Sequence, residues 1–374
     1  RAMDNSIFGS GAKAVFPVGD TAPYLAFLNT TLVTDLLKAL SPTVNFEAGH
    51  IGNLPIIDIG GHKESVSILA RRLVALSRLD WNAYERSWDF QSLPILSASS
   101  APTPTLESSY TAWITQNRDT IAEMKRLEEE NNRLFIDAYG LADELTPDVP
   151  IEQITLTVNP AYRYGGKLTE EEQWTRFRQD TMEELVSYAI GCMMGRYSLD
   201  APGLIYAHSG NEGFDPSQYT TFPADDDGIV PLTDTEWFED DATNRLVEFI
   251  SVAWDASHLE ENLDFLAANL SPKRGESSRD TLRRYFTDKC FKDHLQTYKK
   301  RPIYWLFSSG KQKAFQCLVY LHRYNEGTLA RMRTEYVIPL TGKLNAHIGK
   351  LDSDKLASGS AAETRKLEKE IERL

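Results

Sequence analysis

Apolar residues recur at three- and four-residue steps through most long segments of this 374-residue chain, and this spacing constrains the fold most. Residues spaced in this way lie on one side of an α-helix, so each such segment predicts a helix with one apolar face. Between residues 23 and 40 the spacing is carried by Leu25, Leu28, Leu32, Leu36, Leu37 and Leu40. The other predicted helices cover about 63–79, the charged stretch after residue 105, 185–194, 246–270, and segments beginning at Ser278 and Thr328. No single apolar stripe runs through 279–300, which predicts a kink or two short helices there.

Few segments favour β-strands. The short apolar run 14–18 and the alternating stretch Ile151–Val158 are predicted strands. The stretch 44–46 follows the first predicted helix, and residues 49–52 are a predicted turn. Two further apolar runs, 303–307 and 314–321, flank a six-residue polar connection that contains a glycine. This pattern is typical of a β-hairpin with lysines at its tip. The predicted fold class is therefore α+β, mainly helical.

Composition shifts divide the chain into segments. Residues 97–105 are rich in Ser, Pro and Thr and predict a linker, followed by a charged helix as far as residue 150. Residues 151–340 form a predicted mixed α+β region. In the tail, 341–374, apolar residues recur in two half-heptad runs that a Ser/Gly/Ala break separates, which predicts a helical hairpin. These tail residues are Leu344, Ile348, Leu351, Leu367, Ile371 and Leu374.

Several classes of protein are excluded by composition. The formal net charge is −14, so the chain is not coated uniformly with basic residues for nucleic-acid binding. No apolar run reaches the roughly 18 residues of a membrane span, and the start has no signal-peptide pattern. The three cysteines are far apart, so neither a disulfide framework nor a zinc site is indicated. We therefore expect a soluble, cytoplasmic protein without a membrane partner.

Positive charge is concentrated in one part of the chain, residues 271–334, which we call the basic segment. It holds fifteen Lys or Arg residues against five Asp or Glu residues, a net charge of +10. A polyanion is the natural partner, because each neutralised phosphate releases a counterion. The predicted DNA contacts are Lys273, Arg274, Arg279, Arg283, Arg284, Lys299, Lys300, Arg301, Lys311, Lys313, Arg323, Arg331 and Arg333.

These cations are expected on the surface, because Lys and Arg are rarely buried without a partner. The best-placed phosphate contacts are Lys299–Arg301, before a predicted strand, and Lys311 with Lys313 at the hairpin tip. An open alternative is a solvated surface that the chain's own acids balance. The aromatic residues of the segment are expected mostly in the core, although they could stack on bases. They are Tyr285, Phe286, Phe291, Tyr298, Tyr304, Trp305 and Tyr324.

The stretch Asn159-Pro-Ala-Tyr162 is similar to the Asn-Pro-Pro-Tyr motif of amino-group DNA methyltransferases, which binds a flipped adenine. Its second proline is replaced by Ala161, and no Gly-rich strand–turn–helix for S-adenosylmethionine precedes it. The nearest sequence, Phe8-Gly-Ser-Gly11, has its glycines one position away from the usual spacing. We therefore interpret Asn159 as the end of a strand at an Asn-Pro turn.

No other pattern supports a catalytic or metal site. The acidic stretch 225–241 lacks the spacing of a calcium loop, so we interpret it as a pair of solvated acidic loops. The seven histidines are scattered, without i, i+4 pairs or an adjacent nucleophile motif. Catalytic residues and metal ligands are predicted to be none.

Several stretches together resemble one family. The segments 23–33 and 40–56 resemble the closing part of a target-recognition domain of restriction-modification specificity modules. Together with 187–200, 225–232, 300–310 and 331–340, they make the chain similar to the C-terminal half of the PglX family. These proteins are the adenine-specific DNA methyltransferases of BREX phage-defence systems.

The resemblance implies a part of such a protein rather than the whole. Residues 1–96 would be the C-terminal part of a target-recognition domain, and the methyltransferase domain with its catalytic motif is absent, so no catalytic residue carries over. For the whole protein it implies S-adenosylmethionine-dependent methylation of adenine N6 in double-stranded DNA, and no cofactor in this chain. It also implies exclusion of unmodified phage DNA.

Three functions follow as hypotheses. The first is DNA binding, with backbone contacts from the basic segment and sequence readout partly within the first hundred residues. The second is a protein-interaction scaffold that docks other BREX proteins or a phage protein that mimics DNA. The third is a self-contained methyltransferase that uses Asn159 and Tyr162 and therefore binds S-adenosylmethionine by itself.

Overall fold

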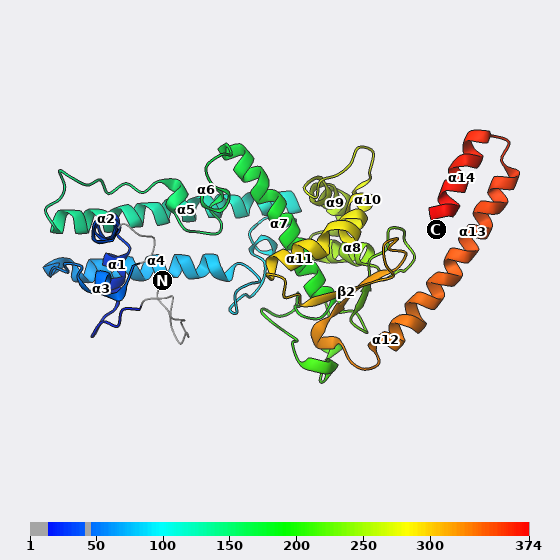
Figure 1. Cartoon of the computed structure of the whole chain (residues 1–374), viewed down its shortest axis with the longest axis horizontal. Coiled ribbons are helices and arrows are strands. Elements are labelled where there is room, and N and C mark those ends of the chain that lie inside the picture. The colour runs from blue at the N-terminus through cyan, green and yellow to red at the C-terminus, as the bar shows by residue number, and fades with distance from the viewer. Residues whose placement is uncertain (1–13, 42–45, 374) are drawn as a thin grey trace. The chain divides into compact units, whose positions relative to one another are not determined.

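The computed structural model describes residues 14–41 and 46–373, which form many helices and one small sheet (Figure 1). The chain divides into two compact units, residues 1–87 with 112–175 and residues 88–111 with 176–374. Helices α5 (Leu106–Ala138) and α7 (Glu170–Met193) contribute residues to both units. The mainly helical α+β class predicted from the sequence is confirmed. The four segment boundaries drawn from composition stay a prediction.

The first unit is helical. Besides parts of α5 and α7 it contains α1 (Ala22–Leu28), α2 (Thr31–Leu40), α3 (Ala48–Gly52), η1 (Gly60–His62), α4 (Lys63–Asn82), η3 (Ile151–Gln153) and α6 (Pro160–Tyr164). Its core joins Phe27 of α1, Val66 and Ala70 of α4, and Phe135 of α5. The Asn131 side chain donates to the Ala26 carbonyl at 2.9 Å, which fixes α5 beside α1.

The predicted helix 23–40 is two helices. The Thr30 hydroxyl accepts the Val33 N–H at 3.2 Å and so begins α2, because Thr is a favourable N-cap. Residues 48–52 form the short helix α3 rather than a turn, and residues 14–18 form no strand. Residues 44 and 45 of the stretch 44–46 lie outside the described residues. The helix predicted at 63–79 is confirmed as α4.

The strand predicted at Ile151–Val158 is wrong. Ile154, Leu156 and Val158 are buried, as their alternation suggested, but the backbone pairs with no other strand. The N–H groups of Thr157 and Val158 donate instead to the Asp80 carboxylate, at 2.8 and 2.9 Å. A buried side chain on α4 therefore satisfies the backbone donors that a sheet would otherwise have paired.

The second unit contains a small antiparallel sheet, of which Figure 1 labels strand β2, and the strand order is β1-β3-β2. Its strands are β1 (Ile229–Pro231), β2 (Tyr304–Ser308) and β3 (Gln316–Tyr320). The register places Trp305 opposite Val319 and Phe307 opposite Cys317. The predicted hairpin is thus confirmed, and β2 is an edge strand.

The second unit also contains several helices and helical turns. They are α8 (Ala242–Ala253), α9 (Leu259–Ala268), α10 (Ser278–Tyr285), the π-helical turn η7 (Phe286–Cys290) and α11 (Phe291–Thr297), with 3₁₀ turns η2 (Pro94–Leu96), η4 (Ser209–Asn211), η5 (Pro216–Gln218), η6 (Ala256–His258) and η8 (Leu321–Arg323). The kink predicted within 279–300 is confirmed at η7. The single helix predicted over 246–270 is wrong, because the backbone leaves the helix at Trp254, whose indole donates to Ser109 Oγ at 3.0 Å.

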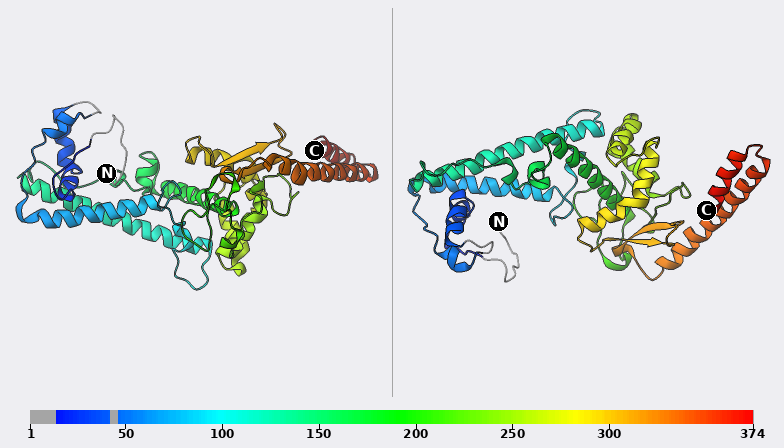
Figure 2. Two further views of the ribbon diagram at one scale, coloured as in Figure 1. Left: turned by 90° about the horizontal axis from the view of Figure 1, so that it is seen from below. Right: turned by 45° about the horizontal axis from the view of Figure 1, so that its top comes forward.

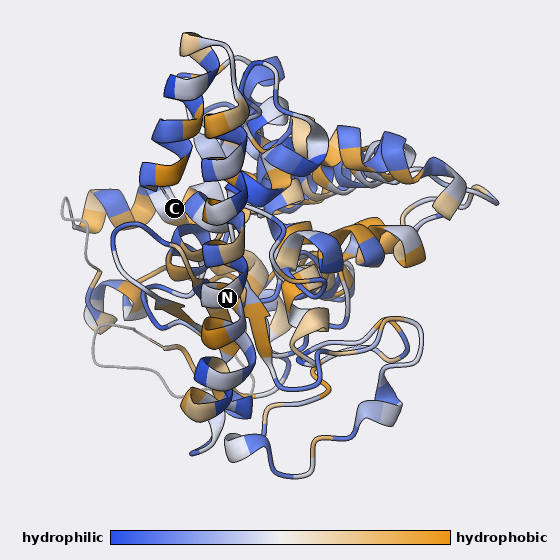
Figure 3. Cartoon of the chain, turned by 90° about the vertical axis from the view of Figure 1, so that its right-hand side faces the viewer, coloured by the Kyte–Doolittle hydropathy of each residue, from blue (hydrophilic) through white to orange (hydrophobic). Residues whose placement is uncertain are grey.

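The C-terminal helical region, residues 328–373, covers one face of the sheet and then leaves it. It consists of α12 (Thr328–Arg331), the π-helical turn η9 (Met332–Val337), α13 (Ile338–Ala357) and α14 (Ala361–Arg373). Met332 and Tyr336 pack on Cys317 and Val319 of β3. Helices α13 and α14 lie side by side in both views, which confirms the predicted helical hairpin (Figures 1 and 2). Hydrophobic and hydrophilic residues alternate along the helices, as amphipathic spacing requires (Figure 3). Among the described residues, no helix is both long and apolar enough to cross a membrane.

Candidate nucleic-acid interface

The basic segment forms α10, η7, α11, the β2–β3 hairpin and α12, all within the second unit. Ser277 begins α10 through a reciprocal cap, because its hydroxyl accepts the Asp280 N–H while the Asp280 carboxylate accepts the Ser277 N–H at 3.1 Å. The predicted start of this helix at Ser278 is confirmed. The thirteen predicted contacts fall into two groups, according to whether their charges are already engaged.

Three arginines of α10 are engaged by carboxylates. Arg279 makes two hydrogen bonds of 2.7 Å to Glu260, and Arg284 makes two to Glu276 at 2.7 and 2.9 Å. The hydrogen bond from Arg284 holds the pKa of Glu276 down, at about 2. Arg283 is nearly buried and donates to Asp241 and to the Thr233 carbonyl.

Two further predicted contacts have ion pairs at the surface. Lys313 at the hairpin tip contacts Asp288 at 2.9 Å and also donates to the Thr287 carbonyl at 3.1 Å. Arg331 contacts Glu335 one helical turn away, at 3.4 Å. Both side chains remain half exposed, so these pairs contribute little to stability but partly neutralise the charge.

The expectation of an exposed side chain is wrong for Arg323, which is 1% exposed. Its guanidinium donates to Asn211 Oδ1 at 2.9 Å and to the carbonyls of Asp225 and Asp226. It also lies over the ring of Phe214, 3.8 Å from the ring centre. Arg323 therefore holds the interior together and is not available to a phosphate.

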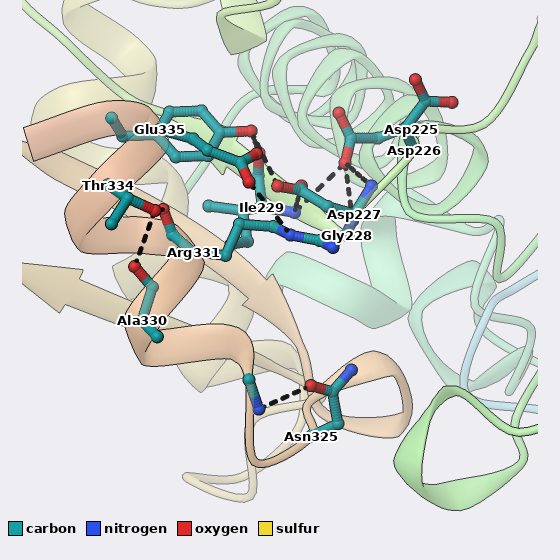
Figure 4. A network of polar contacts seen from close by, with 12 residues as sticks. Asp225, Asp226, Asp227, Gly228, Ile229, Asn325, Ala330, Arg331, Thr334 and Glu335 are labelled. Carbon is teal, nitrogen blue, oxygen red and sulfur yellow. Dashed lines mark hydrogen bonds and ion pairs between the residues drawn. The ribbon is translucent and has the colours of Figure 1, made fainter. Parts of the chain in front are cut away.

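The acidic loops are not solvated as predicted at their key positions. Asp225 is 9% exposed and Asp241 is 1% exposed. The Asp225 carboxylate accepts the backbone N–H groups of Asp227, Gly228 and Ile229, and so closes the turn that leads into β1 (Figure 4). Burial raises the pKa of Asp225. These two carboxylates organise the turns beside the sheet, whereas Asp226, Asp234, Glu236 and Glu239 are exposed, as predicted.

The remaining predicted contacts are exposed, and none of them forms an ion pair with another described residue. We call them the free cations: Lys273, Arg274, Lys299, Lys300, Arg301, Lys311 and Arg333. Lys299 and Lys300 adopt left-handed conformations, with φ of 51° and 63°. This backbone closes α11, because the Lys300 N–H donates to the Leu295 carbonyl at 2.7 Å. The turn therefore presents three consecutive charges just before β2.

A fourth free cation lies beyond the other end of that strand. Lys311 sits in the connection between β2 and β3, whereas Lys299–Arg301 precede β2. A strand of five residues is about 17 Å long, so the two positions are separated by roughly that distance. Trp305 on the same edge strand is 39% exposed and lies beside Tyr324, with ring centres 5.7 Å apart. Stacking of a base on Trp305 stays a prediction, whereas Tyr285, Phe286 and Tyr304 are in the core, as expected.

Asn159 has a structural role that accounts for its whole side chain. Its amide donates to the carbonyls of Ile151 and Ile154 at 2.7 and 2.9 Å, and its oxygen accepts the Ala161 N–H at 3.2 Å. The predicted Asn-Pro turn is confirmed, although it begins helix α6 and does not follow a strand. Phe8–Gly11 lies outside the described residues. Within the described ranges, no group of three His, Cys, Asp or Glu side chains could hold a metal ion.

Sequence reasoning missed one cation of this region, Arg196. It lies three residues after the end of α7, outside the basic segment, and its guanidinium contacts the hydroxyls of Tyr197 and Tyr320. A net-charge count cannot find such a residue, because it is one isolated Arg in an otherwise apolar stretch. Only the fold brings it to the sheet end where Tyr298 and the free cations Lys299–Arg301 lie.

Comparison with known proteins places this geometry in context. No protein-family model matches the chain. It is 42% identical over 381 residues to the adenine-specific methyltransferase BrxX of Escherichia coli O9:H4 (strain HS), an alignment that covers 98% of this chain and 31% of BrxX. It is 39% identical over 325 residues to the adenine-specific methyltransferase PglX of Lacticaseibacillus casei (strain Zhang), covering 84% of this chain and 25% of PglX.

The resemblance inferred from the sequence is therefore confirmed along most of this chain. The chain spans about a third of the length of one relative and a quarter of the other. The similarity thus concerns a portion of these methyltransferases.

Proposed function

We propose that this chain is the DNA-contacting portion of an adenine-specific DNA methyltransferase of the BREX phage-defence type. The observation that carries the proposal is the group of free cations on both sides of β2, Lys299–Arg301 and Lys311, in a segment of net charge +10. A cation without an intramolecular partner gains most from a phosphate, because no existing ion pair has to break. The similarity to two adenine-specific methyltransferases favours DNA as the polyanion.

We also propose that methyl transfer and DNA positioning are carried out by different parts of the whole protein. Transfer of a methyl group from S-adenosylmethionine to adenine N6 would be carried out by a domain outside these 374 residues. The free cations would hold the duplex in position, since phosphate contacts position a protein without specifying sequence. Readout of the target site would come partly from the first hundred residues. Protection against phage would follow from marking host DNA.

The test compares two triple variants that remove the same charge. The first, K299Q/K300Q/R301Q, removes three free cations, and the second, R279Q/K313Q/R331Q, removes three cations that already have carboxylate partners. Affinity for a labelled duplex is measured by fluorescence anisotropy across a salt series. We expect the first variant to lose about 2.7 units of the log–log salt slope, at about 0.9 per phosphate contact, and the second to lose much less.

The loss should be the same for duplexes of unrelated sequence, because the proposed contacts are made to the backbone. Equal loss in both variants would mean that only the net charge matters and would contradict the assignment of Lys299–Arg301. Absence of duplex binding by the unmodified chain would contradict the proposal itself, and retention of a protein partner would then favour the scaffold.

A further inference from the structure

Arg196 is held in a fixed position where α7 ends. Gly195 has a φ of 75°, and an added Cβ there would lie 2.6 Å from the Phe214 ring, so only glycine fits. The Arg196 N–H then donates to the Gly191 carbonyl at 2.8 Å, which closes the helix end. The backbone therefore directs one particular side chain toward the end of the sheet.

The Arg196 guanidinium is half-buried and has no acidic partner. Its Nε donates to the Tyr197 hydroxyl at 3.1 Å and one terminal nitrogen donates to the Tyr320 hydroxyl at 3.4 Å. No carboxylate of the described residues forms an ion pair with it, in contrast to Arg283 and Arg284. A guanidinium has five N–H donors, and these two hydrogen bonds use only two of them.

The two neighbouring histidines, His294 and His322, are uncharged. His322 is half-buried, and its Nδ1 atom is buried with no hydrogen-bond partner among the described residues. Burial, and next the positive charge of Arg196, lower the pKa of both His294 and His322. Both imidazoles are therefore neutral near pH 7 and add no positive charge to that of Arg196.

The free cations of the turn before β2 lie close to this group. His294 connects the two, because its ring centre lies 4.9 Å from that of Tyr298, which directly precedes Lys299, and 4.8 Å from that of Tyr304, which packs on Tyr320. The Leu321 N–H donates to the Ile303 carbonyl at 3.0 Å, which joins the end of that turn to the residue before His322. Arg196 and the free cations Lys299–Arg301 thus lie at the same end of the β2–β3 hairpin.

We infer that Arg196, which like His322 contacts Tyr320, forms an anion site that binds one phosphate group of the DNA backbone, continuous with the free cations Lys299–Arg301. The guanidinium would donate its remaining N–H groups to phosphate oxygens. This inference rests on the proposed function for its ligand. The inference goes beyond the proposed function because it assigns a specific phosphate site to a half-buried arginine outside the basic segment, in addition to the surface cations.

The first measurement uses inorganic phosphate as the probe. Thermal unfolding is followed in phosphate and in chloride at equal ionic strength, for the unmodified chain, R196Q and the surface control R331Q. We expect phosphate to raise the Tm of the unmodified chain and of R331Q but not that of R196Q. Equal stabilisation of R196Q would overturn the site, because a residue that only closes α7 would change the baseline Tm and not the response to phosphate.

The second measurement is duplex affinity. Loss of charge-assisted hydrogen bonds to one phosphate should weaken binding by R196Q about tenfold, with R331Q near the unmodified value. If the unmodified chain binds no duplex yet shows the Arg196-dependent phosphate effect, the proposed function fails and the site serves a free phosphate ligand. If the chain binds duplex but R196Q changes neither readout, the inference fails and the proposed function stands.

A third measurement uses only the unmodified chain, so its result does not depend on whether R196Q folds. In the unmodified chain, the ring ¹⁵N and ¹H signals of His322 are followed by NMR during titration with phosphate, with His62 as a surface reference. We expect saturable shifts at His322 that are absent at His62. Unshifted His322 signals would overturn the inference whatever the stability of the variants.

Discussion

Arg323 shows how a cation can be placed inside this molecule without a bonded carboxylate. Its three nitrogens donate to Asn211 Oδ1 and to the carbonyls of Asp225 and Asp226, which carry partial negative charge. Gly228 allows the close approach, because it has a φ of 73° and an added Cβ would lie 3.1 Å from Arg323 Cβ. One side chain therefore joins the acidic turn before β1 to the turn after β3.

We expect Arg323→Met to destabilise the second unit strongly. Methionine fills similar space but leaves buried carbonyl oxygens without donors, so the free energy of unfolding should fall by about 3 kcal/mol or more. Urea unfolding measures this, with R331M as the matched surface control, expected within about 0.5 kcal/mol of the unmodified chain. Similar stabilities for the two variants would show that Arg323 does not organise these turns.

Residue type alone could not separate the engaged cations from the free ones. The sequence places Arg323 and Lys311 in the same basic segment, but one is buried and the other is exposed. The carboxylates that engage Arg279 and Arg283, namely Glu260 and Asp241, lie 19 and 42 residues earlier in the chain. Such pairs depend on tertiary packing, which local sequence patterns do not encode.

At the scale of elements, His294 joins helix α11 to the start of strand β2. Its Nε2 atom accepts the N–H groups of Ile303 and Tyr304 at 2.9 and 3.2 Å, which requires the neutral imidazole. The side chain is buried, and burial together with Arg196 lowers its pKa to about 4. Protonation would therefore break the connection that positions the free cations Lys299–Arg301.

This arrangement predicts a pH dependence of stability with a definite sign. The folded-state pKa is lowered from 6.5 to about 4, so the unfolded chain binds more protons between these values. Stability from this group is complete above about pH 6.5 and is lost as the pH falls toward 4, by up to about 3 kcal/mol. Urea unfolding of the unmodified chain and of H294Q at pH 7 and pH 4.5 measures the difference. An equal loss in H294Q would rule out His294 as its source.

Local patterns predicted the elements whose causes are local. The hairpin follows from two apolar runs and a polar connection, and α10 follows from its cap at Ser277. The two predicted helices 23–40 and 246–270 are each interrupted. Thr30 caps a new helix within an unbroken leucine pattern, and the backbone leaves the helix at Trp254, whose indole donates to Ser109. The strand predicted at 151–158 does not form, because the Asp80 carboxylate, 77 residues from Thr157, accepts the backbone N–H that a neighbouring strand would have paired.

At the scale of the whole molecule, the charge distribution suits selective binding of a polyanion. The net charge of −14 repels nucleic acid from most of the surface, whereas the basic segment carries +10. The structure reduces the available positive charge within that segment, because several cations already have acidic partners. The seven free cations remain accessible, and four of them, Lys299–Arg301 and Lys311, flank the edge strand β2, which accords with positioning a duplex rather than wrapping it.

The most direct test of this account is the affinity of the unmodified chain for a labelled duplex, measured by fluorescence anisotropy over a salt series. If the seven free cations bind phosphates, the log–log slope should approach about −6, at about 0.9 per contact, and a few contacts would give about −3. The account predicts a slope in this range that does not depend on duplex sequence. No binding at low salt, or binding insensitive to salt, would contradict it and would leave the basic segment to an acidic protein partner.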